Sequence, residues 1–108
     1  MTPAELSKIL EGVPEGALPS GPFRSLVNIN DTIDDDSIVL NAAVGAMLAW
    51  LAVGHYSVSI AQNFPTSGTW EVVVDCDEIN NRKSVERRPT LIEALAAACR
   101  AVAKENAR

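Results

Sequence analysis

Residues 38–53 (IVLNAAVGAMLAWLAV) and the two stretches that follow, 55–62 (HYSVSIAQ) and 69–76 (TWEVVVDC), decide the fold. In the first stretch only Asn41 is polar, which predicts a helix that is apolar nearly all round and buried on more than one side. In the other two stretches apolar and polar residues alternate, as in strands with one buried face. A turn-rich loop separates these two strands, so we expect an antiparallel hairpin.

Capping residues mark two further helices on either side of this region. Thr90 and Glu93 form a capping box directly after Pro89, and the helix that follows carries an apolar stripe. Thr2 and Glu5 form a similar pair at the start of a much shorter helix. Both helices are therefore predicted from local sequence alone. The stripe of the last helix consists of Leu91, Leu95, Cys99 and Val102.

These elements predict an α+β fold in which an antiparallel sheet packs between or against two long helices. The sheet contains the hairpin plus one or two further strands, in the order α-β-β-(β)-α, with an N-terminal helical arm. Residues 1–22 are interpreted as a short capped helix and a Pro/Gly-rich linker, and residues 23–108 as a single α+β sandwich domain. Phe23–Asn30 leans towards a strand, and residues 77–88 are either a loop or an edge strand.

The composition excludes several classes of protein. The chain has 108 residues, a net charge of -5 and a pI near 4.7, which argues against broad nucleic-acid binding. Its two cysteines are too few for a disulfide-rich scaffold. Met1 is not followed by a basic region and an apolar run, and residues 38–53 are too short for a membrane span. We therefore expect a cytoplasmic protein.

Few residues favour catalysis. His55 is the single histidine, and a Ser–His pair with Ser57 or Ser59 lacks a nucleophile elbow and an orienting carboxylate. Both cysteines fall on apolar faces and are interpreted as buried thiols. Residues 34–36 are all aspartate, and they favour the start of a helix over a metal site. We expect no enzymatic activity, no cofactor and no metal.

Positive charge is more concentrated. Arg82, Lys83, Arg87 and Arg88 fall within seven residues, and they are the candidate phosphate ligands, with Arg24 as an outside candidate. The alternative interpretation is a solvated segment whose basic residues balance the acidic residues around them.

A series of short motifs follows in a fixed order between Asp34 and Ala103. They are the helix 38–53, residues 54–58 and 69–72, Pro89-Thr90, and residues 94–96 and 99–101. This order resembles the small phage proteins of the phage ABA sandwich domain type, although not the family's usual opening helix. The resemblance implies an antiparallel sheet sandwiched by helices, encoded by a phage or prophage, and a homo-oligomer, but it implies no common activity.

Two functions are predicted from these features. The favoured one is a non-enzymatic phage accessory protein that binds a small anionic ligand, by analogy with small phage proteins that sequester nucleotide immune signals. The alternative is a protein-interaction or structural module with no small-molecule ligand. A homo-oligomer, dimer or higher, is expected for both because the helix 38–53 has excess apolar surface. A double-stranded-RNA-binding domain shares the element order, but residues 90–98 contain no Lys or Arg.

Overall fold

The computed structural model describes residues 2–19, 38–63, 68–76 and 81–106, and it confirms the α+β class with a three-stranded antiparallel sheet. Phe23–Asn30, the aspartates at 34–36 and Arg24 lie outside these residues. The elements in chain order are α1 (Pro3–Ile9), the 3-10 helix η1 (Glu15–Ala17), α3 (Ile38–Val53), β1 (Tyr56–Asn63), β2 (Thr69–Cys76), β3 (Asn81–Arg88) and α4 (Leu91–Asn106).

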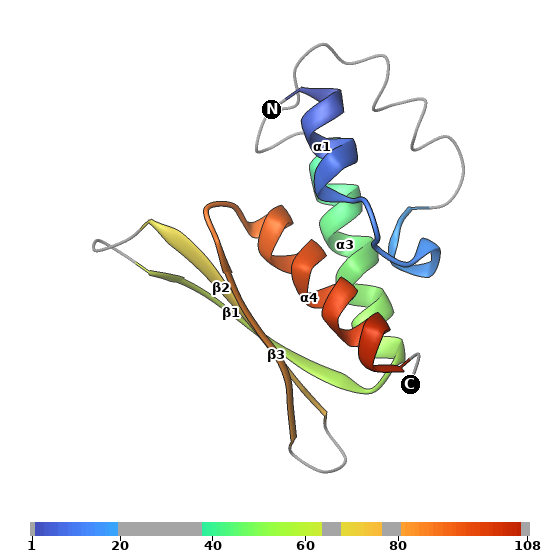
Figure 1. The fold of residues 1–108 in the computed structure, drawn as a ribbon, viewed down its shortest axis with the longest axis vertical. Coiled ribbons are helices and arrows are strands. Elements are labelled where there is room, and N and C mark those ends of the chain that lie inside the picture. The colour runs from blue at the N-terminus through green and yellow to red at the C-terminus, as the bar shows by residue number, and fades with distance from the viewer. Residues whose placement is uncertain (1, 20–37, 64–67, 77–80, 107–108) are drawn as a thin grey trace.

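The strands form one meander in the order β1-β2-β3 (Figure 1). β1 pairs antiparallel with β2, with Val58 opposite Val74, which confirms the predicted hairpin. The choice between loop and edge strand is settled for residues 81–88, because they form β3 and pair antiparallel with β2. The register shifts once, between Val74 and Asp75. Such a bulge bends the strands locally and increases their twist.

The sheet has one covered and one open face. Val72 and Val74 of β2 are fully buried, and Tyr56, Val58 and Trp70 pack against the same core. The β1 residues that alternate with Tyr56 and Val58 point to the other face and are exposed: Ser57, Ser59 and Ala61. Both long helices lie on the covered side (Figure 1), with α4 against β2 and β3 and α3 against β1. The sequence alternation thus follows from helices on a single side.

α3 is buried along a narrower stripe than its composition predicts. Leu40, Ala43, Met47 and Leu51, spaced by three or four residues, face the core. η1 adds a second contact, where a Cβ built on Gly16 would lie 3.3 Å from Cδ1 of Trp50. The sheet, α4 and η1 leave the opposite side of the helix exposed.

Gly54 follows α3, but it is not the residue with a left-handed backbone. His55 has that conformation, with φ of 63°. A Cβ on Gly54 would lie 2.8 Å from Cε2 of Tyr56, too close for any other residue to fit without a shift. The glycine after α3 is therefore explained by the Tyr56 ring.

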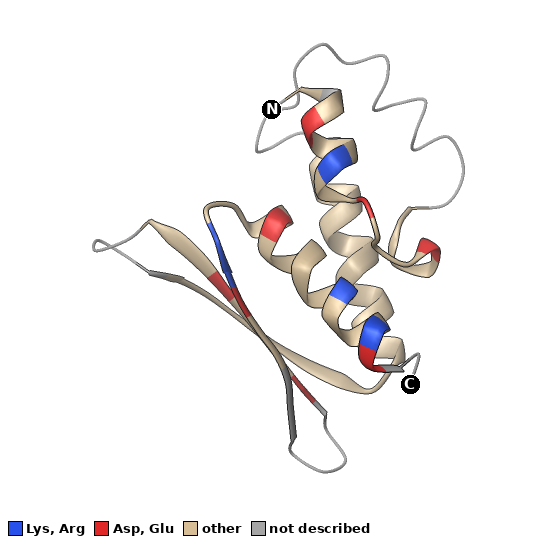
Figure 2. Ribbon diagram, viewed as in Figure 1, with Lys and Arg blue, Asp and Glu red and all other residues tan. Residues whose placement is uncertain are grey.

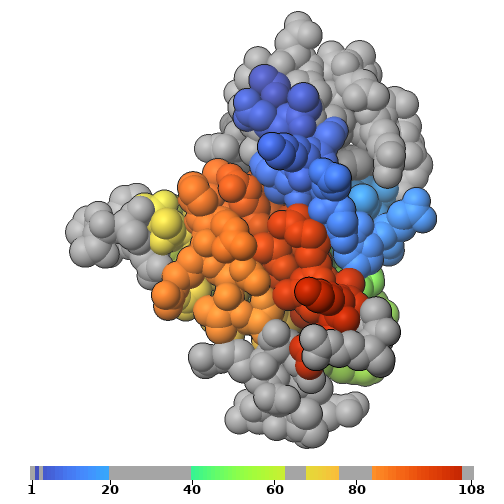
Figure 3. All heavy atoms as spheres, viewed as in Figure 1, coloured from blue at the N-terminus to red at the C-terminus, as the bar shows by residue number. Residues whose placement is uncertain are grey.

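α4 lies at the centre of the packing. Thr90 Oγ1 accepts a hydrogen bond from the Glu93 N–H at 3.3 Å, so the predicted N-cap is formed. The Glu93 carboxylate accepts from the Thr90 hydroxyl at 2.9 Å, whereas a capping box places it on the N-cap backbone N–H. Leu95 and Cys99 are fully buried, as the stripe predicts. α4 and β3 together form a broad surface on one side of the molecule (Figure 3).

The short helix α1 packs on the body of the protein. Thr2 Oγ1 caps it by accepting the Glu5 N–H at 3.2 Å, and Leu6 is fully buried in the common core. Arg100 of α4 donates from Nη1 to the carbonyl oxygen of Ile9 at 2.6 Å. The same guanidinium reaches the Glu11 carbonyl oxygen at 3.3 Å. The first helix is thereby fixed to the last.

Candidate functional site

The basic residues of β3 are divided between the two ends of the strand. Arg82 and Lys83 belong to its first residues, whereas Arg87 and Arg88 are its last two. A strand rises about 3.3 Å per residue, so Arg82 and Arg87 are separated by roughly 17 Å along the backbone. Arg24, the outside candidate, lies beyond the described residues. Residues that are close in sequence are thus spread along the strand.

Arg87 and Arg88 lie on opposite faces of the sheet, because successive strand residues alternate. Arg87 is opposite Glu71 on the open face, and its Nε lies 2.5 Å from Glu71 Oε2. Arg88 is opposite Trp70 on the covered face, and its Nη2 lies 3.1 Å from Glu86 Oε2. Each guanidinium therefore already has a carboxylate partner, and the two do not converge on one point.

These ion pairs leave both arginines available to a stronger anion. The Arg87 side chain is 67% exposed and that of Arg88 is 42% exposed. Exposed ion pairs contribute about 0.2–1 kcal/mol, so a phosphate that offers more contacts can replace the carboxylate. The end of β3 thus remains a candidate anion-binding position, with Arg87 and Arg88 acting separately.

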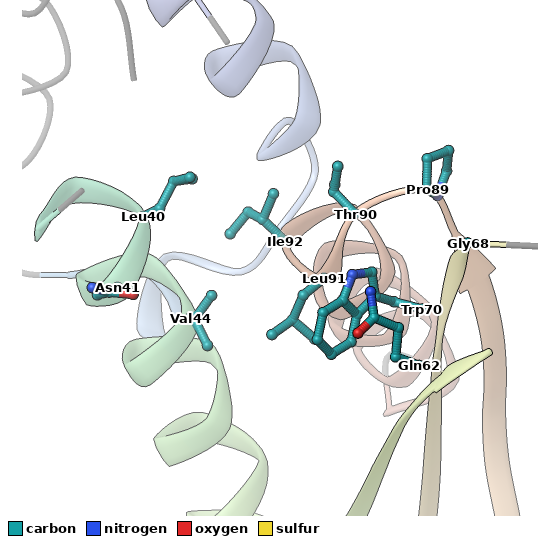
Figure 4. A pocket seen from close by; sticks show the side chains of 10 residues that line it. All are labelled: Leu40, Asn41, Val44, Gln62, Gly68, Trp70, Pro89, Thr90, Leu91 and Ile92. Atoms are coloured by element: carbon teal, nitrogen blue, oxygen red, sulfur yellow. The ribbon is translucent and has the colours of Figure 1, made fainter. Parts of the chain in front are cut away.

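A pocket of about 400 Å³ opens between α3, the end of the β1–β2 pair and the start of α4. Figure 4 shows the α3 residues on one side, with the Trp70 ring and the Gln62 amide across from them. No charged side chain belongs to this lining, which consists of described residues throughout. The lining residues are Leu40, Asn41, Val44, Gln62, Gly68, Trp70, Pro89, Thr90, Leu91 and Ile92.

The exposed side of α3 is the third candidate surface. Figure 2 shows that this helix carries no charged residue along its length, in contrast to α1 and α4. A Cβ built on Gly45 meets no atom within 4 Å, so this position faces open space. Val53 is 80% exposed. We call this surface the α3 face, and it consists of Ala42, Gly45, Ala49, Ala52 and Val53.

The remaining groups with possible chemistry are isolated. Cys99 is fully buried, and burial raises the pKa of its thiol to about 12 although the nearby Arg100 lowers it. A thiol with such a pKa stays protonated and unreactive at neutral pH. Within the described ranges, no three His, Cys, Asp or Glu side chains are grouped as a metal site would need. None of the described helices is both long and apolar enough to span a bilayer.

No family model, curated protein or solved structure matches this chain. The resemblance to phage ABA sandwich proteins therefore stays a prediction.

The pocket and the α3 face differ in how much of each could be predicted from the sequence. The near absence of polar residues in 38–53 predicts excess apolar surface, but not which side of the helix keeps it. The pocket joins residues more than fifty positions apart, such as Leu40 and Leu91, so no local pattern reveals it. Only the packing of α3 beside α4 brings its walls together.

Proposed function

We propose that this chain is a non-enzymatic interaction module that associates with a second copy of itself through the α3 face. The observation that carries the proposal is an exposed, uncharged helix face in a chain of which 21% of residues are charged. Exposed apolar patches of this kind mark interaction surfaces, whereas single exposed apolar residues do not. The phage origin that the sequence resemblance implies would make such a module a phage accessory protein, and its composition favours the host cytoplasm as its place of action.

The residues of the α3 face suit a helix from another subunit. Ala42, Gly45 and Ala49 recur every three or four residues, and their small side chains let a second helix come close. With 16 residues the helix is about 24 Å long, so the stripe continues for several turns. A two-fold axis through this stripe places the same residues on both sides of the interface.

Charge favours the α3 face over the other surfaces of the protein as the contact between two copies. Two chains with a net charge of -5 repel each other, and their contact is least opposed where neither carries charge. The α3 face meets this condition. The open face of the sheet does not, because Glu71 and Arg87 lie on it.

The test is the mass of the protein in solution, measured by analytical ultracentrifugation over a wide concentration range. We expect a dimer or higher oligomer, and we expect Ala49→Glu to shift it to monomer. Ala49 is exposed and Glu is a good helix former, so the fold is retained. Ala4→Glu adds the same charge at an exposed position of α1 and is the matched control. A wild-type protein that stays monomeric at every concentration contradicts the proposal.

Binding of a small anionic ligand, as in sequestration of a nucleotide immune signal, is the second candidate. It is supported by the pocket, whose volume of about 400 Å³ falls within the range of small-molecule sites. Arg88 lies beside the pocket because it is the strand partner of Trp70. Of the predicted phosphate ligands, Arg88 is on the sheet face that borders the pocket, so the phosphate contact is proposed for Arg88. Arg87 lies on the open face, and Arg82 and Lys83 belong to the other end of β3.

A thermal-shift screen against cyclic dinucleotides, cyclic trinucleotides and ADP-ribose isomers tests this second candidate. A ligand at about 100 times its Kd adds roughly 2.7 kcal/mol to the free energy of unfolding, which raises Tm by several degrees. Arg88→Glu is expected to abolish the shift, because Arg88 is the strand partner of the pocket residue Trp70. Lys104→Glu, at an exposed position near the end of α4, is the control. A flat screen removes this candidate.

A further inference from the structure

We infer that the pocket between α3, the β1–β2 pair and α4 binds an uncharged planar heteroaromatic ring, such as a nucleobase or a nicotinamide, stacked against Trp70. The inference is independent of association through the α3 face. It refines the second candidate function, nucleotide binding. The pocket would hold the ring of the nucleotide, a part of the ligand for which the basic residues supply no contact.

The lining of the pocket selects against charge. Among the described residues that form its wall, six are Leu, Val, Ile, Pro or Trp, and none is charged. An unpaired charge moved from water into such surroundings is costly. Arg88, the nearest cation in the strand register, is held by Glu86 at 3.1 Å and does not line the pocket. A neutral group is therefore the better occupant.

The wall formed by Trp70 favours a flat occupant. Trp70 is only half-buried, and in Figure 4 its ring lies with Leu91 on the side of the pocket opposite Val44. An aromatic ring inserted there gains an offset-stacked contact that an aliphatic group lacks. Base–aromatic stacking is tolerant of which base is stacked, because every base has a flat π-face.

Gln62 supplies the polar component at the edge of the ring. It is the strand partner of Trp70, on the same face of the sheet, and its side chain is exposed. A carboxamide offers two donors and one acceptor oxygen, which match the amide and amidine edges of nucleobases and the amide of nicotinamide. An aliphatic chain or a lipid tail would leave this amide unused and carries no group to pair with it.

The experiment uses the full chain with Trp50→Phe, which leaves Trp70 as the single tryptophan of the two in the sequence. Its fluorescence is titrated with adenosine, cytidine and nicotinamide, and with ribose 5-phosphate as an anion that lacks an aromatic ring. We expect saturable quenching by at least one of the three neutral rings and none by ribose 5-phosphate. No saturable quenching by any ring, or equal quenching by the sugar phosphate, overturns the inference.

Two variants locate the binding in the pocket. Gln62→Ala is expected to weaken binding about fivefold to tenfold, the effect of losing one or two hydrogen bonds. Ser59→Ala, on the open face of the same strand, is the matched control and should leave affinity unchanged. Val44→Phe narrows the pocket from the α3 side and should abolish quenching, while circular dichroism checks that the fold is intact. Quenching that survives both pocket variants places the ring elsewhere and overturns the inference.

The same samples separate this inference from the proposed self-association. Their oligomeric state is measured by ultracentrifugation with and without the ring compound. Quenching by a monomeric protein supports the pocket and contradicts association through the α3 face. An oligomer without quenching does the opposite.

Discussion

At the scale of single residues, Cys99 shows how burial changes chemistry. Its side chain is fully enclosed among core residues of α4 and its neighbours, and the loss of water around the thiolate raises the thiol pKa to about 12 from 9.0. Arg100 follows it in the chain and lowers this pKa, but to a smaller extent. The thiol acts as a small apolar side chain of the core.

The raised pKa of Cys99 predicts an alkaline loss of stability. Below pH 9 the thiol is protonated in both the folded and the unfolded chain, so its contribution is fully present. Between pH 9 and about 12 only the unfolded chain loses the proton, so the free energy of unfolding falls by about 1 kcal/mol per pH unit. Urea unfolding at several pH values measures this slope.

Cys99→Ala provides the comparison for the alkaline slope. It removes the thiol at a cost in packing that does not vary with pH, whereas other groups titrate alike in both proteins. The difference in stability between wild type and variant should therefore shrink above pH 9. A constant difference up to pH 11 would contradict the assignment of the shift to burial of this thiol.

At the scale of elements, the N-cap residues determine where the helices α1 and α4 begin. Thr90 and Glu93 exchange hydrogen bonds at the start of α4, and Thr2 accepts the Glu5 N–H at the start of α1. Each cap satisfies a backbone donor that has no partner within its helix. Of the two capped helices, α4 has the greater structural role, because its first turn lines the pocket and the helix covers the sheet.

Loss of the α4 cap should be measurable as a loss of stability. Thr90→Ala removes the Oγ1 that accepts the Glu93 N–H, and we expect the free energy of unfolding to fall by about 1 kcal/mol. Thr90→Ser keeps the hydroxyl and should stay within a few tenths of a kcal/mol of wild type. Urea denaturation at neutral pH measures both. Equal stability of the two variants would show that the cap contributes nothing.

Elements with a strong local signal were predictable, and the others were not. The helix 38–53 and the strand 69–76 were predicted with the bounds that the structure has, because the first is a long, nearly all-apolar run and the second alternates apolar and polar residues. β3 has no such pattern: Ser84 and Glu86 face the covered side, and Val85 is 41% exposed on the other. Its strand character comes from pairing with β2, which a single segment does not encode.

The candidate sites were likewise predictable where they depend on local sequence, and not where they depend on contacts between distant segments. The basic residues and the apolar α3 were evident from composition, whereas the direction of each arginine depends on its register with β2. Arg100 of α4 reaches the carbonyl oxygens of Ile9 and Glu11. These contacts cross about ninety positions of sequence, so no motif within α1 or α4 reveals them.

At the scale of the whole molecule, the first and last helices belong to one core. Leu6 of α1 is fully buried in the same cluster as Leu95 of α4 and Met47 of α3. Arg100 packs its stem across Gly12, where a Cβ would lie 3.1 Å from its Cδ, and Gly12 has φ of 82°. The structure thus joins the short capped helix of the N-terminal arm to the body that the sheet and long helices form.

This packing predicts that the N-terminal helix unfolds together with the rest of the chain. Leu6→Ala should lower the free energy of unfolding by about 2–5 kcal/mol, the usual cost of truncating a buried leucine. Lys8→Ala, at an exposed position of the same helix, should have little effect. Urea unfolding followed by circular dichroism measures both. A near-neutral Leu6→Ala would mean that α1 is a loosely attached arm.

The central place of α4 also has a consequence for synthesis on the ribosome. The nascent chain presents α3 and the strands before α4, yet α4 supplies the cover for Val72 and Val74 and the anchor for α1. Until α4 has emerged, Val72 and Val74 lack the helix that covers them, and α3 lacks one of its packing partners, although it still contacts η1 and β1. Such contacts between distant segments form late, and incomplete chains with exposed apolar surface are prone to aggregate. Truncation before residue 91 should therefore yield a chain that depends on chaperones.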